Sequence, residues 1–247
     1  MNVSVCIASY NGEKYIKEQI NSILSQLKND DEIIISDDSS TDKTIEIIED
    51  INDRRIVLLK NQTFHSHVSN FENALKLAKG AYIFLADQDD IWLENKLETM
   101  LKLLQHYDLV VSDAIMVDGA MHVMYDSFFT FKHSSKGFAK NLYKNTYLGC
   151  CMGFNRHILE IALPFPRGIN MHDWWIGLVG ELYGRVYFSP EKLVKYRRHE
   201  DALTPMGKKS SNNFLQKIGF RVAIIKGLVL RVFKQTWLRY SKNDRQK

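Results

Sequence analysis

Short apolar runs alternate with amphipathic segments along the first hundred residues of the chain. Apolar and β-branched residues run together at 3–10, 32–36, 55–59 and 82–85, which is typical of buried strands. Between these runs, apolar residues recur at helical spacing and predict helices at about 13–26, 42–51, 71–79 and 91–106. Strands that alternate with helices predict an α/β fold, in which a mostly parallel central sheet is flanked by helices.

Polar side chains follow three of the predicted strands at the point where each strand ends. Tyr10 follows the first strand, Asp37 and Asp38 the second, and an acidic cluster the fourth. The cluster is Asp87, Asp89 and Asp90. Ligands of parallel α/β sheets bind at this edge. Adjacent like charges are costly unless a cation is present, and a hard divalent ion prefers carboxylate oxygens.

Local structure offers an alternative interpretation of the same acids. Asp89 or Asp90 can cap the helix predicted from Ile91, and the Asp- and Ser-rich segment 37–42 is typical of a capped loop. A cap needs only one of the three clustered acids, so a helix cap and a metal site are compatible.

Three segments of the chain resemble the family 2 glycosyltransferases. They are residues 3–16, 35–44 and 80–92, of which the last contains Asp-Gln-Asp-Asp-Ile-Trp. This hexapeptide is similar to the bacterial rhamnosyltransferase-like branch, which builds O-antigen and capsular polysaccharides. The resemblance implies a Rossmann-like GT-A fold and an inverting enzyme that uses nucleotide sugars. It also implies a catalytic domain at 1–205, with a nucleotide-sugar-binding half at 1–112 and an acceptor-binding half at 113–205.

The resemblance assigns donor and metal roles to individual positions. The donor set is Ala8, Ser9, Tyr10, Asp37, Asp38, Asp87, Gln88, Asp113, Arg197 and Arg198. Asp38 would accept a hydrogen bond from the imide N–H of a pyrimidine base. Asp89, Asp87 and His199 would bind Mg²⁺ or Mn²⁺, which stabilises the charge that develops on a diphosphate leaving group. The sequence leaves open which of the two arginines points into the site.

The acceptor side is expected further along the chain, around residues 147–154 and 170–176. An inverting transfer needs a base that takes the proton of the incoming hydroxyl, and the resemblance assigns that role to Asp173. The resemblance implies that Gly149 and Cys150 border the acceptor, and Trp174 and Trp175 would contact it, because sugar C–H faces pack on aromatic rings. The alternative for Asp173 is a simple first-turn charge of a helix that runs to Tyr183. His172 is expected to be structural or to orient its neighbours.

The net charge of +4 is unevenly distributed. Residues 206–247 hold eleven Lys and Arg and one acid, Asp244, whereas the other 205 residues hold 22 basic and 28 acidic side chains. The tail predicts a basic amphipathic helix at about 214–240. Its apolar side is expected to carry Val222, Ile225, Val229, Val232, Phe233 and Trp237, and its basic side Lys217, Arg221, Arg231 and Arg239. Such a helix indicates a peripheral anionic membrane surface, with packing on the catalytic domain or a homodimer contact as alternatives.

Other features limit the class of protein. The segment from Met1 into the first strand does not look like a signal peptide, and no segment is long and apolar enough to span a bilayer. Three cysteines without metal-binding spacing are typical of a reducing cytoplasm, so we expect a cytoplasmic protein on the inner face of the cell membrane. The basic tail accompanies no nucleic-acid recognition motif, so nucleic acid is not an expected partner.

The combined expectation is an inverting, metal-dependent glycosyltransferase. It would transfer rhamnose from dTDP-rhamnose, or alternatively a hexose from a UDP-sugar, to a lipid-linked glycan. A phosphohydrolase with an aspartyl nucleophile is a rival hypothesis, but the first strand ends in Ser9, Tyr10 and Asn11 rather than in an acid. A non-catalytic glycan- or lipid-binding module on the same fold is the second rival.

Overall fold

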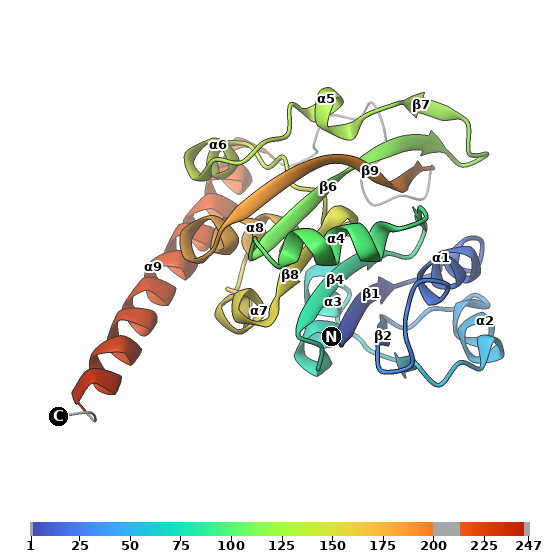
Figure 1. Cartoon of the computed structure of the whole chain (residues 1–247), viewed down its shortest axis with the longest axis horizontal. Coiled ribbons are helices and arrows are strands. Elements are labelled where there is room, and N and C mark those ends of the chain that lie inside the picture. The colour runs from blue at the N-terminus through green and yellow to red at the C-terminus, as the bar shows by residue number, and fades with distance from the viewer. Residues whose placement is uncertain (1, 200–212, 245–247) are drawn as a thin grey trace.

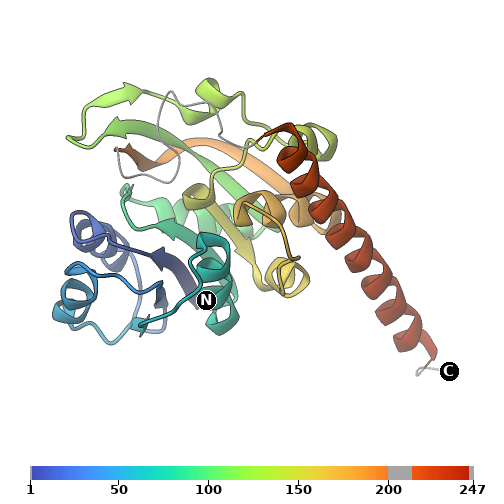
Figure 2. The same cartoon turned by 180° about the vertical axis from the view of Figure 1, so that it is seen from behind.

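The computed structural model describes residues 2–199 and 213–244, without the side chains of residues 214 and 237–244. One nine-stranded sheet runs through the molecule, with helices on both of its faces (Figures 1 and 2). The strands are β1 Val3–Ser9, β2 Glu32–Asp37, β3 Ile56–Leu59, β4 Tyr82–Asp87, β5 Ile91–Trp92, β6 Leu109–Asp118, β7 Val123–Tyr125, β8 Met152–Asn155 and β9 Val186–Arg198. The helices are α1 Ile16–Leu24, α2 Thr44–Ile51, α3 His67–Leu77, α4 Lys96–Leu104, α5 Phe128–Lys132, α6 Phe138–Tyr143, α7 Arg156–Ala162, α8 His172–Tyr183 and α9 Phe214–Asp244, and a 3₁₀ turn, η1, spans Gly149–Cys151.

The α/β fold class predicted from the pattern is confirmed, and the sheet is mixed. The strand order is β3-β2-β1-β4-β8-β6-β9-β5, with β7 paired to β6. β3, β2, β1 and β4 are parallel, whereas β8 runs antiparallel to both of its neighbours. β6 continues from residue 109 to residue 118, across the position at which we expected the two halves of the catalytic domain to meet. β6 is parallel to its other neighbour, β9. Parallel pairing is therefore interrupted at β8, between β4 and β6.

The register of β1 brings the three predicted strand ends together. Ser9 lies opposite Asp37 in β2, and Ala8 lies opposite Asp87 in β4. The polar residues that follow these strands therefore share one edge of the sheet, as the sequence predicts.

The helix expected at 91–106 begins later than predicted. Ile91 and Trp92 form β5, which pairs with β9, and α4 starts after Asn95. Trp92 is buried against Phe84, so packing and strand pairing override the helical spacing of this segment. Asp90 is not a helix cap. Its carboxylate accepts a hydrogen bond from the backbone N–H of Arg197 (2.8 Å).

The helix predicted in the basic tail is confirmed as α9, and its orientation differs from the expectation. Ile224 and Leu228 are buried against the catalytic body. Arg221 donates to the carbonyl of Tyr143 (2.5 Å), and Arg231 donates to the carbonyls of Ile161 (2.7 Å) and Pro164. These two arginines therefore face the body rather than solvent. Trp237 and Arg239 lie outside the described side chains. Among the described residues, no helix has both the length and the apolar character needed to cross a membrane.

Candidate active site

Two aspartates end β2, and the loops around them occupy both carboxylates. Asp37 is fully buried and accepts hydrogen bonds from the hydroxyls of Ser9 (2.8 Å) and Ser40 (2.6 Å) and from the N–H of Ser40 (2.8 Å). Asp38 accepts from the backbone N–H groups of Phe64 (2.6 Å) and Ser66 (3.1 Å). Asp37 thus shapes the loop, while the Asp38 carboxylate retains acceptor capacity for a further donor.

Tyr10 stands at the end of β1 with an exposed ring. The side chain of Gln88 fixes its backbone in both directions: Oε1 accepts from the Tyr10 N–H (2.9 Å), and Nε2 donates to the Tyr10 carbonyl (3.0 Å). A Cβ on Gly12 would lie 2.6 Å from the same Oε1, so a larger residue there would displace the Gln88 side chain from these hydrogen bonds. Gln88 therefore fixes the backbone that carries the aromatic ring of Tyr10. Ala8 and Ser9 precede Tyr10 at the end of β1.

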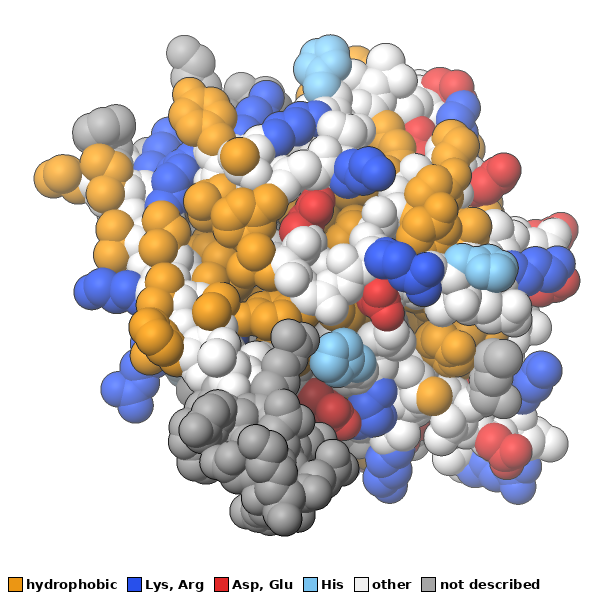
Figure 3. Space-filling view, turned by 60° about the vertical axis from the view of Figure 1, so that its left-hand side comes forward, with side chains coloured by type: hydrophobic (Ala, Val, Ile, Leu, Met, Phe, Trp, Pro, Cys, Tyr) orange, Lys and Arg blue, Asp and Glu red, His pale blue; other side chains and the backbone are white. Residues whose placement is uncertain are grey.

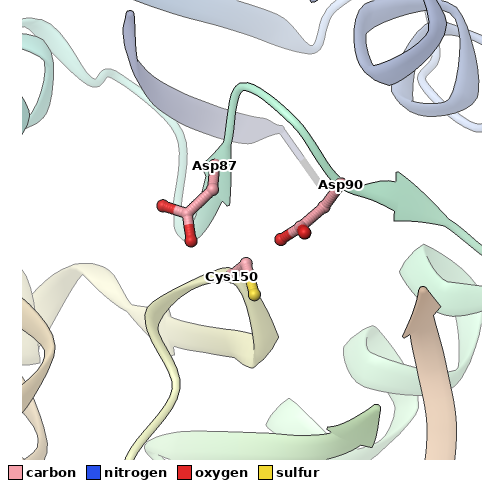
Figure 4. Close-up of side chains that lie close together, drawn as sticks. All are labelled: Asp87, Asp90 and Cys150. Carbon is pink, nitrogen blue, oxygen red and sulfur yellow. The ribbon is translucent and has the colours of Figure 1, made fainter. Parts of the chain in front are cut away.

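Asp87 and Asp90 follow β4 and converge on Cys150 of η1 (Figure 4). Ligand atoms of these three residues lie within 4.8 Å of one another. Burial, and then the charges of Asp89 and Asp173, raise the pKa of Asp87 to about 7. Burial also raises the pKa of Asp90 and of the Cys150 thiol well above their usual values. A protonated thiol is a poor ligand for a hard cation, so Cys150 acts here as a hydrogen-bond donor to the acids.

Asp89 and His199 come together across 110 residues of sequence. His199 Nε2 lies 2.8 Å from Asp89 Oδ2, and the imidazole ring packs against Tyr15 at 4.9 Å between centroids. His199 Nδ1 and Asp90 Oδ2 are buried without a hydrogen-bond partner among the described atoms. Clustered carboxylates and an adjacent imidazole fit Mg²⁺ or Mn²⁺, so the residues present suit the expected ion.

Arg197 holds the end of β9 onto this turn. Its Nε donates to the Asp89 carbonyl (2.8 Å), its guanidinium pairs with Glu18 (2.6 Å), and its CZ lies 4.3 Å from the Tyr15 ring centroid. Arg197 is buried, and these contacts occupy its guanidinium, so it holds the turn in place. Arg198 projects to the other side of the strand. It donates to the Tyr196 hydroxyl (2.7 Å), and its Nε has no partner among the described atoms.

Asp173 lies in the first turn of α8, almost completely buried. Its Oδ1 accepts from the Trp174 N–H (2.5 Å) and from Asn145 Nδ2 (3.3 Å), and the backbone N–H of Gly149 donates to the same carboxylate. Burial nevertheless raises the pKa of Asp173 to about 6. A carboxylate with such a pKa is ionised at neutral pH and is a stronger proton acceptor than an exposed aspartate.

Gly149 and His172 complete the surroundings of this acid. A Cβ on Gly149 would lie 3.0 Å from His172 Nε2, so η1 packs directly on α8. His172 is stacked on Phe71 with 3.9 Å between ring centroids, and burial lowers its pKa to about 3. The imidazole is therefore neutral and leaves Asp173 without a cationic partner.

One expectation for the acceptor side needs correction. Trp174 and Trp175 are buried, and their indole N–H groups donate to the carbonyls of Asn141 (2.6 Å) and Ala162 (2.9 Å). Trp175 has no exposed surface, so the pair belongs to the core and does not form a sugar platform. Asp113, which was expected on the donor side, anchors the start of α5, because its carboxylate accepts from the Ser127 hydroxyl (2.6 Å) and the Phe129 N–H (2.9 Å).

Lys96 and Asn145 are site residues that the sequence analysis missed. Lys96 is completely buried, donates to the carbonyl of Cys150 (2.6 Å) and lies 4.5 Å from the centroid of the Trp92 ring. Its charge lowers the pKa of Asp87, so it partly balances the acidic cluster. Helical spacing makes Lys96 look like an ordinary surface lysine, and its only distinctive signal is its closeness to the three acids.

The fold and the site together define a Rossmann-like α/β protein, in which a carboxylate-rich sheet edge faces a buried aspartate. The family model described as "Glycosyl transferase family 2" matches residues 4–161. This match covers more than half of the chain, so the chain belongs to glycosyl transferase family 2.

Two relatives agree with this assignment. The Escherichia coli protein WfaP, described as UDP-Glc:alpha-D-GlcNAc-diphosphoundecaprenol beta-1,3-glucosyltransferase, is 42% identical over 103 residues, which are 42% of this chain and 41% of the relative. The match therefore spans about two fifths of the relative. The putative teichuronic acid biosynthesis glycosyltransferase TuaG of Bacillus subtilis is 28% identical over 263 residues, which cover 98% of this chain and 95% of TuaG.

Solved structures share the fold. S. aureus TarS in complex with UDP-GlcNAc superposes with a TM-score of 0.70 at 20% identity, covering 91% of this chain and 66% of that chain. The mannosyltransferase PcManGT from Pyrobaculum calidifontis in complex with GDP-Man and Mn²⁺ has a TM-score of 0.59 at 19% identity, covering 83% and 58%. At such identities the likeness concerns the fold alone.

Proposed function

We propose that this protein transfers a sugar from a nucleoside diphosphate sugar to a hydroxyl of a lipid-linked glycan, with inversion at the anomeric carbon. The observation that carries the proposal is the position of Asp173. This buried carboxylate, with a pKa near 6, lies close enough to Asp87 to raise the pKa of that donor-side acid. A proton acceptor therefore stands close to the acidic cluster, and a single displacement requires such a group to deprotonate the incoming hydroxyl.

In the proposed reaction, Asp173 takes the proton of the acceptor hydroxyl. The hydroxyl oxygen forms a bond to the anomeric carbon while the bond from that carbon to the diphosphate oxygen breaks. The negative charge leaves with the nucleoside diphosphate. The hydrogen bonds from Trp174, Asn145 and Gly149 to the carboxylate hold the base in one orientation before the acceptor arrives.

The acids after β4 and the imidazole at the end of β9 form the proposed metal site. Asp89 and His199, 2.8 Å apart, would hold Mg²⁺ or Mn²⁺, with Asp87 close by. When bound, this ion would stabilise negative charge on the leaving diphosphate. Arg198 would contact phosphate oxygens, because its guanidinium donates to the hydroxyl of Tyr196, whose pKa is raised by burial and by the charges of Asp90 and Asp87.

For the nucleotide, we propose a uracil or thymine base against Tyr10, with Asp38 accepting its imide N–H. The Asp38 carboxylate lies at a loop held by Phe64 and Ser66, next to the end of β1. The name of WfaP includes UDP-Glc, and the TarS structure is a complex with UDP-GlcNAc. A UDP-sugar is therefore the first donor to test. dTDP-rhamnose is the second, because the hexapeptide at 87–92 suggested it.

For the acceptor, we propose a glycan on a polyprenyl diphosphate, the class that the name of WfaP gives. We further propose that the protein works on the cytoplasmic face of the membrane and that basic α9 lies against anionic lipid. A phosphohydrolase is not supported, because no acid follows β1 at the position of an aspartyl nucleophile. A non-catalytic module is disfavoured by the elevated pKa of Asp173, which a binding protein does not need.

The test is a transfer assay on the full chain with UDP-glucose, UDP-GlcNAc, dTDP-rhamnose and GDP-mannose, each with Mn²⁺ and with chelator. A water-soluble glycoside and a lipid-linked glycan serve as acceptors, and NMR of the product reports the anomeric configuration. We expect chelator-sensitive transfer with inversion from one pyrimidine nucleotide sugar. The Asp173→Asn variant should bind the nucleotide with unchanged affinity and lose transfer at least 100-fold. Retention of configuration, or unchanged transfer by this variant, would overturn the proposal.

A further inference from the structure

α9 turns an apolar face outward, and this face borders a groove on the catalytic body. Figure 3 shows hydrophobic side chains gathered on this side of the molecule, with Lys and Arg around them. Every residue that lines the groove is apolar, and its volume is about 480 Å³, within the range of small-molecule sites. The lining residues are Phe138 and Leu142 of α6, Leu182 of α8, and Ile225, Leu228, Val229, Val232 and Phe233 of α9.

The contacts that attach α9 to the catalytic body do not cover this apolar face. Ile224 and Leu228 are buried, and Arg221 and Arg231 attach the helix to backbone carbonyls of the body. Val229 and Phe233 nevertheless remain 47% and 69% exposed. A contiguous exposed apolar surface of this kind marks a binding site more often than a solvated face.

Two of the elements that line the groove also carry or adjoin the residues of the proposed base. Leu142 lies near the C-terminal end of α6, three residues before Asn145. The side chain of Asn145 donates to Asp173. Leu182 lies in α8, nine residues after Asp173, which corresponds to about 14 Å along the helix and about half a turn around it. An apolar chain in the groove would thus run along two of the elements that position Asp173.

Charge selects among possible occupants. Lys217, Lys226 and Lys234 are exposed on α9, and the only acid in residues 206–247 is Asp244. Pairing this face with its own copy around a two-fold axis would bring like charges together, whereas an anionic lipid complements them.

We propose that the groove formed by α6, α8 and α9 binds the isoprenoid chain of the acceptor lipid, with the diphosphate head group directed toward Asp173. This inference rests on the proposed function, because it names the part of the acceptor that the groove holds. In this proposal the groove contacts the isoprenoid chain of one lipid molecule. This role is more specific than attachment of the C-terminal helix to a membrane surface.

The test measures binding of farnesyl diphosphate to the full chain by calorimetry, with inorganic diphosphate as the head-group-only probe. The groove variant is Val229→Ser combined with Val232→Ser, and the matched control is Leu230→Ser. Leu230 is 64% exposed on the same helix and does not line the groove. Leu182→Gln changes the opposite wall of the groove. All these side chains are at least 42% exposed, so the substitutions should leave the melting temperature nearly unchanged.

We expect both groove variants to weaken farnesyl diphosphate binding about tenfold, because each removes apolar contact area, while the control stays within twofold of the parent. Equal loss in the control, no loss in the groove variants, or equally tight binding of inorganic diphosphate would overturn the proposal. A dimer that the valine variants dissociate would assign the face to a second copy instead. Transfer to the water-soluble glycoside is measured in parallel, so a failure of the proposed function is recognised independently of a failure of the groove.

Discussion

Asp173 allows a stability prediction that is independent of any substrate. Burial shifts its pKa from 3.8 to about 6, and about two pKa units correspond to about 3 kcal/mol of unfavourable ionisation in the folded state. Asp173→Asn removes this charge but can match only one of the two carboxylate oxygens, so one hydrogen bond is lost at a cost of about 1 kcal/mol. The variant should therefore be about 2 kcal/mol more stable at pH 8, which corresponds to roughly 4–8 °C in melting temperature for a chain of this size.

The dependence on pH identifies the cause of this stabilisation. The pKa of the folded state is raised, so the favourable contribution of protonated Asp173 is complete below pH 3.8 and is lost as the pH rises through about 6. The advantage of the variant should accordingly be about 1 kcal/mol smaller at pH 5 than at pH 8. Urea unfolding followed by circular dichroism at both pH values measures the difference. A variant that is less stable than the parent at pH 8, or an advantage that does not change with pH, would refute the reasoning.

Three further outcomes follow from the site. The rate kcat/KM should rise with pH through about 6 and then level off, because Asp173 must be ionised to accept a proton; an activity that is flat between pH 5 and pH 8 contradicts its role as base. His199→Ala should weaken Mn²⁺ binding at least tenfold in a calorimetric titration, since its Nε2 lies 2.8 Å from Asp89, and unchanged affinity would remove the histidine from the metal site. Lys96→Met should shift the pH dependence of Mn²⁺ binding to higher pH, because Asp87 loses a balancing charge and its pKa rises, whereas Lys102→Met, an exposed control in the same helix, should leave that dependence unchanged.

The donor side of the site follows closely from local sequence signals. In a parallel sheet the polar residues that follow each strand lie at the same edge, whatever the position of the strand in the sheet. The pattern alone therefore locates β1, β2 and β4 and brings their ends together. The sequence wrongly predicts a helix at 91–95, because the apolar residues there do recur at helical spacing. Ile91 and Trp92 instead pair with β9, which lies about a hundred residues further along the chain. Local periodicity contains no information about that pairing.

The acceptor side was harder to predict for a related reason. Tryptophans next to an acid look like a sugar platform, and only the three-dimensional packing reveals that Trp174 and Trp175 donate to carbonyls inside the core. The direction of α9 was likewise undetermined, because a helical wheel gives the two faces without saying which one meets the body. The arginines reach inward because backbone carbonyls of the body lie within their range.

The contacts at the end of β9 also determine when the protein becomes competent during synthesis. Arg197 bonds to Glu18 across 179 residues, and His199 meets Asp89 across 110 residues. The strands of the nucleotide half can pair while the chain is still emerging from the ribosome, since their contacts are more local. Such distant contacts form late in folding. A nascent chain that has not yet reached His199 therefore lacks the imidazole beside Asp89, and the proposed metal site stays incomplete until that residue has been added.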